Sequence, residues 1–275
     1  MFRRILLGFF WDTYDNLGHI LLANILWFVC NLPGLLVIYF LFHLTAGLNL
    51  LWIFLIIPIG IFSVTTVGLF AYTKQLMELK DNSIKQFFMG IKQYSGKATV
   101  IVLIHVLIFI LVAVNINFYI QLRGNMQMAG VVLAGIAFWC GVLVTLESVY
   151  ALAILVQHNL GIRKTLKRSF LIVLDNLWIT IGIFIFLLSF LILCLFSGIG
   201  PVLFMMSGIA MLGNNAIYEI MTKYEQKPIV EPPLAPGEKP TSWKQILDQE
   251  KADQQPKWRH DNRGWKDIFR PWDYK

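Results

Sequence analysis

Charged residues are scarce in this sequence of 275 residues, where Asp, Glu, Lys and Arg together make up 14%. Soluble domains average about 25% charged residues, so a chain of this length cannot cover itself with a water-facing surface. The scarcity excludes intrinsic disorder, a coiled coil and an ordinary soluble enzyme. Because 57% of the residues are hydrophobic, the class that remains is a polytopic membrane protein.

Cysteine and the short motifs of catalysis are also scarce or missing. Cys30, Cys140 and Cys194 lie in separate apolar runs, so they suggest neither a disulfide framework nor the paired spacing of a metal site. The HExxH motif of metalloproteases, the GxSxG motif of serine hydrolases and glycine-rich phosphate loops do not occur. We therefore expect a protein that is not an enzyme and that holds no cofactor and no metal.

Long hydrophobic runs dominate what the sequence does contain. A membrane-spanning helix needs about 20 mainly apolar residues. Six stretches meet this need, at 19–43, 48–73, 98–122, 127–156, 177–197 and 201–222. Pro33 and Pro58 fall inside the first two and should kink them. The predicted fold is an all-α integral membrane protein with six transmembrane helices within residues 19–225.

The first 18 residues and the distribution of positive charge complete the predicted topology. In residues 1–18 the apolar side chains share one helical face, away from Arg3 and Arg4, which is typical of an uncleaved interfacial helix. With six spans, 22 of the 23 Lys and Arg residues fall on one side of the membrane and only Arg123 on the other. The positive-inside rule then places both termini in the cytoplasm.

The same charge distribution bears on possible partners. Basic segments at 74–97 and 158–168 serve as orientation signals and as contacts for anionic lipid head groups. No soluble basic domain with a recognisable nucleic-acid-binding module is present. We expect the lipid bilayer, and not nucleic acid, to account for the net charge of +7.

Three stretches carry a family resemblance: the run NILWFVCNLP from Asn24 to Pro33, the segment 63–98, and the close of the last span at 218–225. The segment 63–98 contains Thr65, Thr66, Gly68 and Tyr72, followed by Phe87, Phe88, Gly90 and Lys92. Together they resemble the YesL-like family of bacterial membrane proteins over about residues 1–225. The resemblance implies a multi-span protein of the bacterial plasma membrane with no established activity, and it hints at an accessory role in carbohydrate uptake. The 50 residues that follow depart from the family.

Glu147 is the first candidate for a functional residue, because an intramembrane carboxylate is costly enough to suggest a function by default. At helical spacing it shares a face with Tyr150. Four other polar residues fall toward the same cytoplasmic side: Asp175, Asn214, Asn215 and Glu219. Spans four to six are therefore predicted to enclose a polar vestibule. In the alternative, Glu147 lies at the membrane boundary, hydrated or paired with Arg163 or Lys164, and the asparagines are packing contacts between helices.

His105 and a stripe of small residues are further candidates within the spans. His105 has no second His or carboxylate three or four residues along its helix, so we expect a neutral, hydrogen-bonded histidine. Small residues let helices approach closely. A stripe of them along the fourth span predicts packing against another helix of the same chain or against a second copy of the chain. Packing within the same chain is the commoner outcome. The residues of the stripe are Gly130, Ala134, Ala137 and Gly141.

Residues 226–275 form a tail of different composition. Five of the ten prolines lie in 226–240, which is typical of a semi-rigid spacer. Four tryptophans follow: Trp243, Trp258, Trp265 and Trp272. Tryptophan anchors protein interfaces and also favours the lipid–water boundary. Because the tail has 10 basic and 8 acidic residues, attraction to anionic lipid is weak, which favours a protein partner.

Two functions remain open from the sequence. The first is a non-enzymatic accessory, assembly or scaffold protein whose tail holds a membrane or cytoplasmic partner. The alternative is a transporter of a small solute or ion that uses the vestibule around Glu147. Transporters often carry interrupted helices at matching positions in two halves. Pro33 and Pro58 both lie in the first half, which favours the accessory role.

Overall fold

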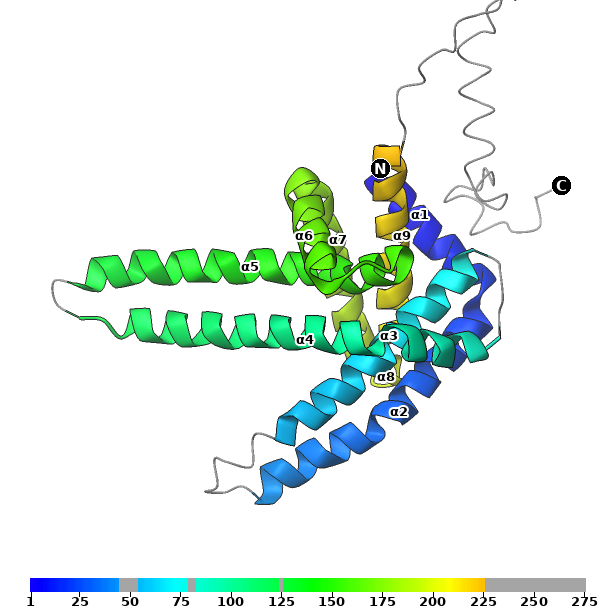
Figure 1. Cartoon of the computed structure of the whole chain (residues 1–275), viewed down its shortest axis with the longest axis horizontal. Helices are drawn as coiled ribbons and strands as arrows, with labels where there is room; N and C mark the ends of the chain where they lie inside the picture. Colours follow the sequence, from blue (N-terminus) through cyan, green and yellow to red (C-terminus); the bar gives the residue numbers. More distant parts are fainter. Residues whose placement is uncertain (45–53, 79–82, 124–125, 226–275) are drawn as a thin grey trace, which may run out of the picture. The chain divides into compact units, whose positions relative to one another are not determined.

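The structure is a computed structural model that describes residues 1–44, 54–78, 83–123 and 126–225. Within these ranges the chain is helical and contains no strand (Figure 1). Residues 1–219 form one compact unit, and the end of the last helix, residues 220–225, is assigned to a second unit. The all-helical class predicted from the sequence is therefore confirmed. The four tail tryptophans, and the first residues of the predicted second span, lie outside the described residues.

Five helices in the described ranges are long and apolar enough to cross a membrane. They are α2 (Leu17–Leu44), α3 (Ile56–Met77), α4 (Lys85–Ile120), α5 (Gln127–His158) and α7 (Leu177–Phe196). Helices α2, α5 and α7 begin and end within two residues of their predicted spans. Helix α3 begins at Ile56 and ends four residues beyond the predicted span 48–73, so Pro58 lies in its first turn and not inside a span. Helix α4 begins well before the expected start at residue 98. It begins early because Phe87, Gly90 and Tyr94 are buried against other helices, so the basic segment is a packed helix.

The remaining helices are shorter or less apolar: α1 (Phe2–Asp15), α6 (Ile162–Asp175), α8 (Gly200–Leu203) and α9 (Met205–Glu225). The sixth predicted span, 201–222, falls on α8 and α9, which are separated at Phe204. The apolar run is therefore not one continuous helix. The segment 158–168, expected as a basic loop, contains the first half of α6.

One buried side chain, Asn24 of α2, spans the break between α8 and α9. Its Nδ2 donates to the carbonyls of Pro201 (2.9 Å) and Val202 (2.7 Å), and its Oδ1 accepts from the backbone N–H groups of Met206 and Ser207, both at 2.9 Å. A helix end leaves such backbone groups without intrahelical partners. An asparagine amide offers two donors and two acceptor sites, and here all four are used.

Helix α3 lies between α2 and α4 and also contacts α5. Its approach to α4 depends on two glycines: a Cβ built on Gly90 would stand 2.3 Å from the Cβ of Ala71, and one on Gly68 would stand 2.7 Å from Ile91. Polar contacts join α3 to α2, where Trp27 Nε1 donates to Thr66 Oγ1 at 3.1 Å. Several residues of the segments 24–33 and 63–98 are thus contacts between helices.

A second side-chain hydrogen bond connects α2 and α3, from Asn31 Nδ2 to Thr65 Oγ1 at 2.8 Å.

Helix α5 runs back along α4 (Figure 1) and also contacts α6 and α7. Helices α4, α5 and α6 are therefore mutually in contact, and this arrangement positions the site described next.

Candidate functional site

A buried carboxylate, Glu147 of α5, connects three helices. Its Oε2 lies 2.5 Å from Nε2 of His105 on α4, and its Oε1 accepts a hydrogen bond from the Ser169 hydroxyl on α6. Glu147 is 6% exposed, His105 is 7% exposed and Ser169 is fully buried. Since burying a lone ionised carboxylate is very costly, the two partners are what allow Glu147 to occupy this position.

The partners of His105 determine where its hydrogens are. Its Nδ1 lies 2.8 Å from the carbonyl oxygen of Ile101, one turn earlier on α4. A carbonyl only accepts, so Nδ1 carries a hydrogen. In a neutral imidazole with that hydrogen, Nε2 is an acceptor, and an ionised carboxylate is an acceptor too. Two acceptors do not bond, so a further proton must lie between Nε2 and Oε2.

This shared proton makes the His105–Glu147 pair neutral as a whole. It is either an imidazolium beside a carboxylate or a neutral imidazole beside a protonated carboxyl group, and both forms carry no net charge. Loss of the proton would leave one buried negative charge and two facing lone pairs. Removing one partner of a buried ion pair typically costs about 3–5 kcal/mol for the same reason.

Ser169 completes the cluster but is not arranged as a nucleophile. Its single hydroxyl hydrogen is within reach of Glu147 Oε1 and of the carbonyls of Thr165 and Leu166, both at 3.0 Å. In serine hydrolases the serine donates to a histidine nitrogen that takes its proton. Here both nitrogens of His105 face other oxygens. The arrangement stabilises the carboxyl group and does not activate the serine.

A tight turn places Ser169 against Glu147. Helix α5 ends at His158 and is followed by Asn159, which has φ 47° and ψ 39°, and residues 159–161 lead into α6. Asparagine tolerates this left-handed conformation better than most residues. Lys97 of α4 donates to Asn159 Oδ1 at 2.9 Å, so the turn is also tied to the helix that carries His105.

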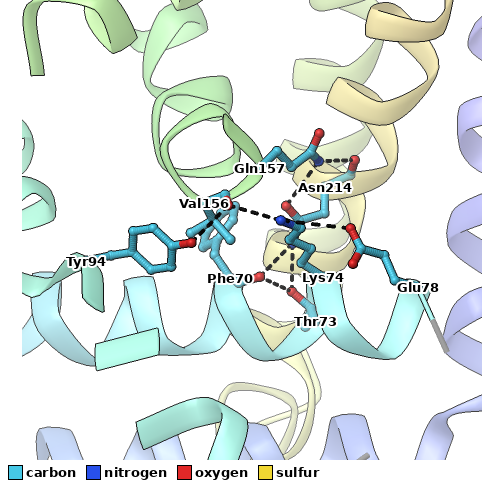
Figure 2. A network of polar contacts seen from close by, with 8 residues as sticks. All are labelled: Phe70, Thr73, Lys74, Glu78, Tyr94, Val156, Gln157 and Asn214. Atoms are coloured by element: carbon cyan, nitrogen blue, oxygen red, sulfur yellow. Dashed lines mark hydrogen bonds and ion pairs between the residues drawn. The ribbon is translucent and has the colours of Figure 1, made fainter. Parts of the chain in front are cut away.

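A second polar cluster surrounds Asn214 of α9 and is shown in Figure 2. Asn214 Nδ2 donates to the Phe70 carbonyl (2.8 Å) and to Thr73 Oγ1 (2.9 Å) on α3, and Gln157 of α5 donates to the Asn214 carbonyl at 2.9 Å. Beside them, Lys74 Nζ donates to the Val156 carbonyl near the end of α5 at 3.3 Å. The cluster joins α3, α5 and α9.

The same carbonyl of Val156 also accepts from the Tyr94 hydroxyl of α4, at 3.4 Å. Lys74 in turn pairs with Glu78, one turn further along α3, at 3.8 Å. Hydrogen bonds from lysine to the last carbonyls of a helix are favourable because they neutralise its negative end. The cluster therefore anchors the end of α5 that leads into the turn at 159–161 (Figure 2).

The residues predicted to line one vestibule bond in separate places. The Tyr150 hydroxyl donates to Thr180 on α7 at 3.0 Å, away from Glu147, although the two residues share a helix. Asn215 donates to the carbonyl of Met211 at 3.2 Å. Glu219 lies 3.9 Å from Arg4, and Asp175 is exposed at the end of α6. The predicted pairing of Glu147 with Arg163 or Lys164 is not found, because His105 and Ser169 occupy its carboxylate.

His105 was expected to be hydrogen-bonded, and it is, but its bond to Glu147 was missed. The partners are 42 positions apart on different helices, whereas the spacing rule tests neighbours on one helix. A usable signal was present for two of the three residues: polar side chains are rare within apolar runs, so His105 and Glu147, in neighbouring predicted spans, could have been paired. Ser169 lies between predicted spans and carried no such signal. Within the described residues, no three His, Cys, Asp or Glu side chains gather to hold a metal.

The stripe of small residues on α5 faces α4. A Cβ on Gly130 would stand 2.4 Å from the Tyr119 carbonyl oxygen, and one on Gly141 would stand 3.1 Å from Val112 Cγ1. Ala134 is buried between them and Ala137 is half-buried. These residues let α4 and α5 approach each other within one chain.

No family model, no curated protein and no solved structure matches the chain.

Proposed function

We propose that this chain is an integral membrane protein that binds a proton at His105–Glu147 and couples its release to the passage of a small solute or ion. The observation that carries the proposal is the buried, net-neutral pair on α4 and α5, whose geometry requires a shared proton. Ionisable residues among membrane helices are rare and mark proton relays and ion pathways. This pair is the polar group of the bundle best suited to such a role.

Release of the proton requires the pair to meet water. Ser169 lies over Glu147 on the buried face of α6, a short helix of 14 residues that joins α5 through the turn 159–161. A displacement of α6 would remove the serine from the carboxyl group and open the pair to solvent. We therefore assign α6 the role of the moving element and α4 and α5 the role of the frame.

We further propose six crossings, with both termini on the cytoplasmic side of a bacterial plasma membrane and α1 lying in the interface. Arg4 of α1 and Glu219 of α9 lie 3.9 Å apart, which supports an even number of crossings between them. The sixth crossing then consists of α8 and α9, and the break at Phe204 is tolerable because Asn24 satisfies its backbone groups. Interrupted helices of this kind are common in transporters.

The test measures proton movement in vesicles that contain the purified chain and a pH-sensitive dye. A potassium gradient with valinomycin supplies the driving potential. We expect the wild-type chain to acidify or alkalinise the lumen and E147Q to lose at least nine-tenths of that rate. E219Q is the matched control, because it removes a carboxylate outside the cluster. A rate for E147Q equal to that of the wild type would refute the proton role.

A second candidate is the accessory or scaffold function, which the Trp-rich tail favours. Four tryptophans in the last 33 residues are more than a solvated tail needs, and they suit the docking of a partner protein. The resemblance to the YesL-like family supports an accessory role in carbohydrate uptake. Deleting residues 226–275 should abolish copurification of the partner in mild detergent, while E147Q should leave it unchanged. Recovery of the same proteins by the truncated chain would exclude this role.

A further inference from the structure

The surface of α6 that faces away from the bundle has an unusual division of polarity. Its buried face consists of Thr165, Ser169, Ile172 and Val173. On the exposed face, the first two turns carry cations, apolar side chains follow, and the helix ends at the exposed Asp175. The cations are Arg163, Lys164 and Lys167, and the apolar residues are Phe170, Leu171 and Leu174, which are 41%, 51% and 49% exposed.

The division runs along the helix and not around it. At 100° per residue, Arg163, Lys167 and Leu174 fall within about 40° of one another, so charge and apolar surface follow each other on one side. A helix that lies flat in the membrane surface separates polar and apolar residues around its axis. Lengthwise separation instead suits a helix that enters obliquely, with its basic beginning among head groups and its apolar end among acyl chains.

The next residues support the same placement. Helix α7 follows directly, and it is apolar enough to cross a membrane. Trp178, in its first turn, is 85% exposed. Tryptophan concentrates at the level of the lipid head groups. An exposed tryptophan at this position is the expected marker of the boundary that the apolar end of α6 reaches.

The charges of α6 identify the partner. In the described part of the chain, Arg163, Lys164 and Lys167 have no acidic side chain within ion-pair distance. Their positive charge is therefore available to an external anion. The adjacent apolar patch means that this anion should be attached to a hydrocarbon chain. An anionic phospholipid combines both properties, whereas a free phosphate would leave the apolar residues uncovered.

We propose that the exposed face of α6 is a binding site for anionic phospholipid in the surrounding bilayer. Arg163, Lys164 and Lys167 hold the head-group phosphates, and the acyl chains pack on Phe170, Leu171 and Leu174. The inference goes beyond the proposed function, because it holds whether or not the buried pair releases its proton.

The first test measures lipid preference. The full chain is placed in phosphatidylcholine vesicles with a trace of spin-labelled phosphatidylglycerol or phosphatidylcholine, and the protein-bound fraction of each label is compared. We expect a preference for phosphatidylglycerol that falls at least threefold in the variant R163Q/K164Q/K167Q. The charge-preserving variant K164R/K167R is the control and should keep the preference. An unchanged preference in the triple variant would overturn the proposal.

The second test does not depend on the folding of a charge variant. The three native cysteines are replaced by alanine, and a nitroxide is attached at Leu171→Cys. In vesicles with phosphatidylglycerol, dissolved oxygen should relax this label as strongly as one at Ile192→Cys, an exposed site on α7, and a water-soluble nickel complex should barely reach it. Strong relaxation by nickel at position 171 would place α6 in water and refute the site.

Discussion

Replacing Glu147 with glutamine removes the shared proton while keeping every hydrogen bond of the cluster possible. The glutamine amide can donate to Nε2 of His105, which is an acceptor when Nδ1 donates to the Ile101 carbonyl. The glutamine oxygen can accept from Ser169 as the carboxylate does. E147Q therefore separates the proton from the packing, which no apolar substitution at this position would do.

The magnitudes follow from what each variant leaves buried. We expect E147Q to change the free energy of unfolding by less than about 1 kcal/mol, the net value of one ordinary hydrogen bond. H105L leaves the carboxyl group with only Ser169 as a partner, and breaking a buried pair in this way costs about 3–5 kcal/mol. In the double variant H105L/E147Q the residual charge is gone, so it should be more stable than H105L alone.

The assay is reversible unfolding in mixed micelles with increasing SDS, followed by far-UV circular dichroism. Two results would refute the reasoning. If E147Q loses as much stability as H105L, the carboxyl group is needed for packing and not for its proton. If the double variant is less stable than H105L, then Glu147 is not held as a partner of His105.

Two further predictions concern contacts between helices outside the His105–Glu147 pair. Asn24→Leu should lower the free energy of unfolding by about 3 kcal/mol or more, since each buried backbone group left unbonded costs about 1–3 kcal/mol. Asn115→Leu is the control. If both variants lose the same stability in SDS unfolding, Asn24 does not have the role described. Gly90→Ala should cost about 1–3 kcal/mol because its Cβ would stand 2.3 Å from that of Ala71. Gly96→Ala, with nothing within 4 Å, should be neutral or stabilising in the same measurement, and a neutral Gly90→Ala would contradict the close approach of α3 and α4.

The long apolar helices could be predicted from the sequence because transfer into lipid depends on composition over about 20 residues. The predicted spans 127–156 and 177–197 differ by no more than two residues at either end from α5 and α7. The beginning of α4 and all of α6 were not predicted as helices, because their polar residues resemble those of a loop. What makes them helical is a buried face that only the folded bundle provides.

The site depended on contacts that no local pattern contains. Glu147 was found because a carboxylate in an apolar run is conspicuous, but its partners come from two other helices. The break at Phe204 was hidden for a related reason: residues 202–206 are all apolar, and the side chain that bonds the backbone on both sides of the break is Asn24, some 180 positions away in the sequence. The composition of a segment indicates whether it lies in lipid or in water, but it does not indicate which groups its backbone bonds to.

The hydrogen bond between Lys97 and Asn159 connects α4 to the turn between α5 and α6. Residues 159–161 join α6 to α5, and within them the side chain of Asn159 accepts a hydrogen bond from Lys97 at 2.9 Å. Lys97 and His105 lie two turns apart on the same continuous helix. Helix α4, which supplies His105 as the partner of Glu147, therefore also binds the turn that leads into α6, the helix that carries Ser169. The displacement of α6 proposed above would therefore act on a turn that is bonded to the same helix as His105.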